Sequence, residues 1–150
     1  MKSILTEKFL RKLGSWAFII VGIGHIAAHL AAPNTPQRNE IVGAMRGFVI
    51  DMPGRTGTLY EYHQGFSLMM GILLAAYGIR TLLALRAKHL APADELPSLL
   101  FDTLVSGIAV GVSAQLFFAV PMVLTAVALV SFSAALAMVW REARWQGQKI

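Results

Sequence analysis

Hydrophobic residues gather in four long runs that are separated by short polar connections. A helix needs roughly 20 apolar residues to cross a bilayer core about 30 Å thick. By this measure the pattern predicts four membrane-spanning helices over residues 13–32, 59–85, 98–119 and 121–140. No run alternates polar and apolar positions as the strands of a membrane barrel do. The chain is therefore predicted to be an all-α integral membrane four-helix bundle.

Helix-breaking residues mark the limits of these runs. The first run stops at Pro33-Asn34-Thr35-Pro36, a cluster typical of a turn. The last two runs form one apolar stretch that is too long for a single crossing and is interrupted only at residues 117–121. We expect a tight hairpin there, with Pro121 in the first turn of the fourth helix, where its missing N–H costs no hydrogen bond.

The connection over residues 33–58 has a pattern of its own. Apolar residues recur in it at helical spacing, with charged residues between them; the apolar positions are Ile41, Val42, Met45, Phe48 and Val49. This period favours a short amphipathic helix lying at the membrane surface over an ordinary loop.

Composition supports a single membrane domain over residues 1–150. Hydrophobic residues make up 56% of the chain and charged residues 14%, where soluble domains have about 25% charged residues. There is no cysteine, which excludes disulfides and thiol chemistry. The net charge of +5 does not indicate nucleic-acid binding, because the basic residues flank the apolar runs and do not alternate with aromatic residues.

The distribution of basic residues predicts the topology. Most of them fall at the two termini and in the second connection: Lys2, Lys8, Arg11, Lys12, Arg80, Arg86, Lys88, Arg141, Arg144 and Lys149. The opposite side has Arg38, Arg46 and Arg55. Because cytoplasmic loops are enriched in Lys and Arg, both termini are predicted to be cytoplasmic.

Polar residues within the predicted spans gather at one depth. The first helix runs outward, the second inward and the third outward again. Together they bring polar side chains to the outer third of the bundle, in an outer polar layer made of His25, His29, Tyr60, Glu61, His63, Gln64 and Gln115. Ionisable residues in a membrane are costly, so each is a candidate for function. Asp102 lies nearer the cytoplasmic side, and we expect it to pair with Arg80 or Arg86.

The outer polar layer has several interpretations. Its side chains can join the helices by hydrogen bonds without any chemistry. They can also form the polar floor of a cavity for a small lipophilic ligand or a quinone, with contacts from His25, Tyr60, Glu61, Gln64 and Gln115. Proton or ion translocation by a small transporter is a further alternative.

A metal site is another alternative. His25 and His29 are four residues apart, so both imidazoles lie on one helix face, and Glu61 offers an oxygen ligand. This donor set suits zinc, copper or iron, in a metal-binding enzyme or a metal carrier. The spacing argues against a haem held by both histidines, because axial ligands bind from opposite sides of the iron.

Glycines predict close helix packing. Gly107 and Gly111 form a GxxxG pattern in the third span, which suits contact with a neighbouring helix or with a second copy in a homodimer. Pairs of glycines in the first two spans suggest close contact as well: Gly22, Gly24, Gly65 and Gly71.

The assembled motifs resemble a family of small bacterial inner-membrane proteins with four predicted transmembrane helices and no known function. The resemblance rests on Gly24-His25, Ala44-Met45 with Phe48 and Met52, Tyr60-Glu61-Tyr62, Gly65-Phe66-Ser67 and the segment Phe117-Phe118-Ala119-Val120-Pro121. It implies an architecture and a location but no activity. In that family His29 and His63 are often other residues, which weakens the metal interpretation.

These observations favour a non-catalytic protein. No phosphate-binding glycine loop or GxSxG nucleophile elbow occurs in the sequence. We expect the protein to bind a small lipophilic ligand, or to act as an accessory subunit of a larger membrane partner.

Overall fold

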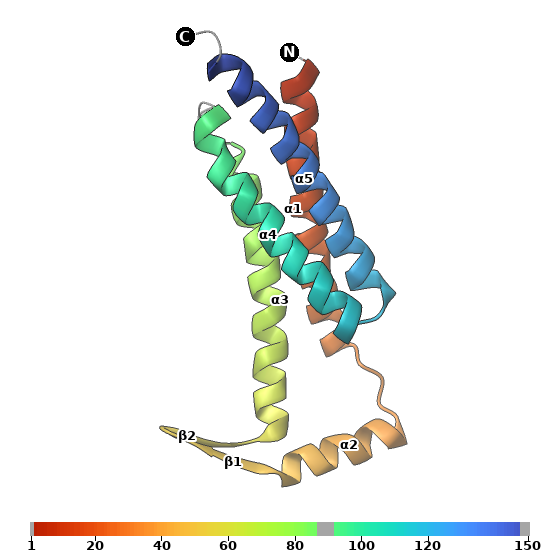
Figure 1. Cartoon of the computed structure of the whole chain (residues 1–150). Coiled ribbons are helices and arrows are strands. Elements are labelled where there is room, and N and C mark those ends of the chain that lie inside the picture. Colours follow the sequence, from red (N-terminus) through yellow and green to blue (C-terminus); the bar gives the residue numbers. More distant parts are fainter. Residues whose placement is uncertain (1, 87–91, 148–150) are drawn as a thin grey trace. The chain divides into compact units, whose positions relative to one another are not determined.

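The computed structural model describes residues 2–86 and 92–147. Within these ranges the chain forms five helices and one two-stranded hairpin (Figure 1). In chain order the elements are α1 (Lys2–Leu30), α2 (Pro36–Gly47), β1 (Val49–Met52), β2 (Arg55–Thr58), α3 (Leu59–Ala84), α4 (Pro92–Leu116) and α5 (Ala119–Gly147).

Four of these helices are long and apolar enough to cross a membrane, as the sequence predicts. The spanning stretches are Thr6–Leu30, Leu59–Ala84, Asp94–Leu116 and Ala119–Trp145. They indicate an integral membrane protein.

The helices extend beyond the apolar runs at several ends. α1 begins at Lys2, well before the predicted start at residue 13, and its added turns hold an ion pair between Glu7 and Arg11, one turn apart. α4 begins at Pro92 and contains Pro97, where the prediction placed a helix start. The hairpin between α4 and α5 is confirmed, with Pro121 in the first turn of α5.

The amphipathic helix predicted in the first connection is present as α2. Thr35 is its N-cap, and the Thr35 hydroxyl accepts a hydrogen bond of 3.2 Å from the Arg38 N–H. Phe48 and Val49, which the pattern assigned to the helix, are instead extended, because the chain leaves α2 at Phe48 and enters β1.

The hairpin of β1 and β2 was not expected from the sequence. The two strands are antiparallel, with Val49 opposite Thr58 and Met52 opposite Arg55. Gly54 turns the chain between them with a φ of 88°, a backbone conformation that favours glycine. The dipeptide Pro53-Gly54 is the local signal that could have predicted this turn.

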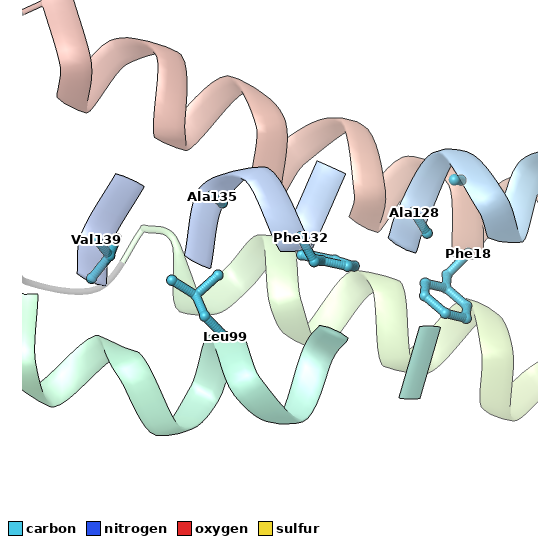
Figure 2. Packing of buried hydrophobic residues seen from close by; sticks show 7 residues of the cluster. Phe18, Leu99, Ala128, Phe132, Ala135 and Val139 are labelled. Carbon is cyan, nitrogen blue, oxygen red and sulfur yellow. The ribbon is translucent and has the colours of Figure 1, made fainter. Parts of the chain in front are cut away.

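The chain divides into two compact units, one made of residues 1–21 and 74–150 and the other of residues 22–73. The first unit contains the apolar core. Its buried side chains come from α1, α4 and α5, and six of them are labelled in Figure 2: Phe18, Leu99, Ala128, Phe132, Ala135 and Val139. α5 supplies most of them at helical spacing, so one face of that helix is buried.

Glycines allow α1 and α3 to approach closely within each unit. In the first unit, a Cβ added to Gly78 would lie 2.5 Å from the backbone oxygen of Ser15. In the second unit, a Cβ added to Gly71 would lie 3.0 Å from the backbone oxygen of Gly22, so both of these glycines lie at a close helix contact, as the sequence suggests. The backbones meet at distances that no other residue permits.

Other predicted packing glycines do not have this role. A Cβ on Gly24, Gly65 or Gly111 would meet no atom within 4 Å among the described residues, and one on Gly107 would meet Leu129 at an ordinary 3.9 Å. Among the described residues the GxxxG pattern therefore makes no close helix contact, and its contact with a second copy stays a prediction. Spacing alone cannot show which face of a helix meets a neighbour.

Replacing Gly78 with Ala should destabilise the protein by about 1–3 kcal/mol, because the new methyl group would overlap the α1 backbone. Thermal unfolding in a mild detergent measures the effect. Gly111→Ala is the matched control, since its methyl group would enter open space, and it should raise the unfolding midpoint slightly because alanine favours the helix. Equal effects of the two substitutions would contradict the packing described here.

Candidate functional site

Ser67 of α3 lies between two histidines of α1. The Ser67 Oγ is 2.9 Å from His25 Nε2 and 3.1 Å from His29 Nδ1. A hydroxyl can donate one hydrogen bond and accept others, so one ring nitrogen can accept from it while the other donates to it. The two histidines share a helix face, as their spacing predicts, and they join α1 to α3 through one serine.

His63 lies close to this group. Its ring centroid is 6.3 Å from that of His29, and the two rings are tilted by 51°. The His63 side chain is exposed, while His25 and His29 are partly buried. Three of the predicted histidines therefore occur together in the unit formed by residues 22–73.

Glu61 has a different role, at the start of α3. Its Oε2 accepts a hydrogen bond of 2.7 Å from the Thr58 N–H, and its own N–H donates to Thr58 Oγ1 at 3.3 Å. This reciprocal pair is a capping box, which satisfies two N–H groups that a helix start leaves free. Arg55 Nη2 lies 3.9 Å from Glu61 Oε1. The carboxylate therefore connects β2 to the first turn of α3.

Tyr60 and Gln64 interact with each other. The Gln64 amide donates a hydrogen bond to the Tyr60 hydroxyl, and the Arg46 guanidinium lies 4.8 Å from the Tyr60 ring centroid. Gln64 Oε1 is buried and has no hydrogen-bond partner among the described residues. Gln115 is an exposed residue of α4 in the other compact unit.

A groove of about 300 Å³ runs along a different face of α3. It is lined by Arg55, Gly57, Glu61, Tyr62, Gly65, Phe66 and Met69. The α3 members are adjacent or three to four residues apart, so they share one helix face. Of the ligand-binding residues predicted from the sequence, Glu61 lines this groove. His25, Tyr60 and Gln64 lie outside it.

The predicted metal ligands do not gather. Among the described residues, no group of three or more His, Asp and Glu side chains could hold a metal ion. Glu61 is held by Thr58, while His25 and His29 face Ser67. A zinc, copper or iron site at these three residues stays a prediction, and it would require the Glu61 carboxylate to leave its capping box.

The first unit contains a second polar group that the sequence analysis missed. Arg11 Nη1 lies 3.0 Å from Glu7 Oε1 and 2.6 Å from Glu95 Oε2. Tyr77 donates a hydrogen bond of 2.6 Å to Asp102 Oδ1, so the hydrogen-bond partner of Asp102 is a tyrosine where an arginine was expected. The spacing of Glu7 and Arg11, one helical turn, was the available signal.

The comparisons with known proteins give no relative for this chain. No family model, no curated protein and no solved structure matches it significantly.

Replacing Thr58 with Ala should destabilise the protein by about 1 kcal/mol, because the N-cap hydroxyl of α3 is lost. Amide hydrogen exchange over the first turn of α3 should accelerate in parallel. Thr58→Ser keeps the hydroxyl and should exchange like the wild type. If the serine variant behaved like the alanine variant, the capping box would not be the stabilising contact.

Ser67→Ala should lower the free energy of unfolding by about 1 kcal/mol, since both histidines lose their shared partner. Chemical shifts of the His25 and His29 ring nitrogens should change together in NMR spectra. Ser98→Ala, at an exposed position of α4, serves as the control and should change neither quantity.

Proposed function

We propose that this chain is a membrane protein that binds a small amphiphilic molecule, a quinone or a lipid, in the groove beside β2 and α3. The observation that carries the proposal is the composition of the groove, which is charged at one end and apolar along the rest. Arg55 and Glu61 supply the charged end, and Phe66 and Met69 supply apolar surface.

The dimensions of the groove suit a small ligand. A volume of about 300 Å³ is at the lower end of the range for small-molecule sites. Glu61 and Met69 are eight residues apart on α3, which corresponds to about 12 Å along the helix axis. This length accommodates a ring or a headgroup together with the first part of an acyl or prenyl chain.

The charges favour a ligand with a polar head. The Arg55 and Glu61 side chains are 72% and 51% exposed, so both can contact a ligand while they remain hydrated. Arg55 donates hydrogen bonds to a carbonyl or phosphate oxygen, and the Glu61 carboxylate accepts one from a hydroxyl. A quinone carbonyl or a lipid headgroup meets this requirement.

The apolar wall favours a lipophilic body. Phe66 and Met69 are 63% and 49% exposed, and Gly65, which also lines the groove, leaves open space, because an added Cβ would meet nothing within 4 Å. With both termini cytoplasmic, as the basic residues predict, the groove lies toward the outer leaflet. The ligand then enters from the lipid without crossing water.

The double substitution of Phe66 and Met69 with Ala should weaken ligand binding about tenfold, which corresponds to the loss of about 1.4 kcal/mol of apolar contact. The measurement is the affinity of purified protein for a short-chain ubiquinone analogue, together with mass spectrometry of the lipids and quinones that co-purify. The two readouts distinguish a quinone from a lipid.

Met70→Ala is the matched control. Met70 is adjacent to Met69 and is 42% exposed, but it does not line the groove. It should bind the analogue and retain co-purifying molecules like the wild type. Equal retention by the double variant and by Met70→Ala would overturn the proposal.

A further inference from the structure

The carboxyl group of Asp102 is buried in the first unit and has incomplete hydrogen bonding. The residue is 1% exposed. Asp102 Oδ1 accepts a hydrogen bond from the Tyr77 hydroxyl, while Oδ2 is buried and has no partner among the described residues. The ring of Phe18 packs edge-on against Tyr77, with centroids 4.9 Å apart, and this contact holds the tyrosine in place.

Arg11 of α1 does not pair with Asp102 within 4.0 Å in the described structure. It contacts Glu7 of α1 and Glu95 of α4 instead, so two carboxylates share its positive charge. The buried side chains that α5 contributes to the described structure do not ionise: Thr125, Ala128, Ser131, Phe132, Ala135 and Val139.

Arg80 of α3 also carries a positive charge. Its side chain is exposed, and it forms no ion pair with Asp102 within 4.0 Å in the described structure. An ionised Asp102 would therefore be a buried carboxylate with no ion pair to either arginine. Burying an unpaired charge costs far more than burying a neutral carboxylic acid.

We propose that Asp102 is a proton-binding site, whose carboxyl group carries a proton on Oδ2 in the resting protein. Tyr77 remains neutral and donates its own hydrogen to Oδ1. Release transfers the Oδ2 proton to water and leaves a carboxylate. Acidic side chains inside a membrane bundle are typical of proton relays. The proton-binding site at Asp102 does not depend on ligand binding in the groove beside β2 and α3.

Infrared spectroscopy of the intact protein in lipid bilayers at neutral pH tests the proposal. The chain has three aspartates, and the other two, Asp51 and Asp94, are exposed. Labelling aspartate with ¹³C at the side-chain carboxyl therefore shifts the C=O band of a protonated Asp102. A labelled protonated-acid band that also moves in D₂O is the expected result. Aspartate signals confined to the carboxylate region would overturn the proposal.

Variants give a second test. Asp102→Asn should abolish the protonated-acid band and lower the unfolding midpoint by less than about 3 °C, since the neutral amide occupies the same space. Asp94→Asn is the matched control: it removes an exposed aspartate of the same helix and should keep the band. A band that persists in Asp102→Asn, or one lost in Asp94→Asn, would contradict the assignment. The labelled wild type decides the matter if a variant fails to fold.

Discussion

The structure depends on the close contact of α1 and α3. At Gly78 in one unit and Gly71 in the other, the absence of a side chain lets one helix backbone lie directly against its neighbour. Two sets of contacts in the described structure use the proximity that results. Ser67 reaches the two histidines of α1, and Phe18 of α1 reaches the ring of Tyr77. Helices held apart by larger side chains would make neither set of contacts.

Many buried polar side chains satisfy themselves within their own helix. The hydroxyls of Ser15, Thr81, Ser106 and Thr125 donate to backbone oxygens one turn earlier. This is how small polar residues are accommodated in lipid, and it marks them as structural. Asp102 and Arg11 differ, because each has a polar partner on another helix, Tyr77 of α3 and Glu95 of α4. Function is therefore better sought among ionisable side chains than among buried hydroxyls.

The sequence alone predicted the structural elements that depend on local residue patterns. The structure confirms the four apolar helices, the helix break at Pro33 to Pro36 and the hairpin before Pro121. These features follow from the length of the apolar runs and from the backbone chemistry of proline. The β-hairpin was missed because the spacing of Phe48 and Val49 assigned both residues to a helix, whereas α2 ends at Gly47 and β1 begins at Val49.

The candidate sites were predictable only in part. The shared face of His25 and His29 follows from helix geometry, but their partner Ser67 is far away in sequence. Glu61 was identified as a candidate, yet the capping signal Thr58-x-x-Glu61 was overlooked. The pairing of Tyr77 with Asp102 depends on which faces of α3 and α4 meet, and one-dimensional patterns do not contain that information.

The position of Glu61 links two equilibria. Its carboxylate closes the first turn of α3 and also lines the groove. A ligand that draws this carboxylate away from the Thr58 N–H opens the cap, so binding of such a ligand and fraying of the helix start rise together. A ligand that contacts Arg55 alone leaves the capping box of Thr58 and Glu61 closed. By thermodynamic reciprocity, a change that stabilises the first turn of α3 weakens the binding of a ligand that opens the cap. The affinity of a ligand that contacts Arg55 alone stays unchanged.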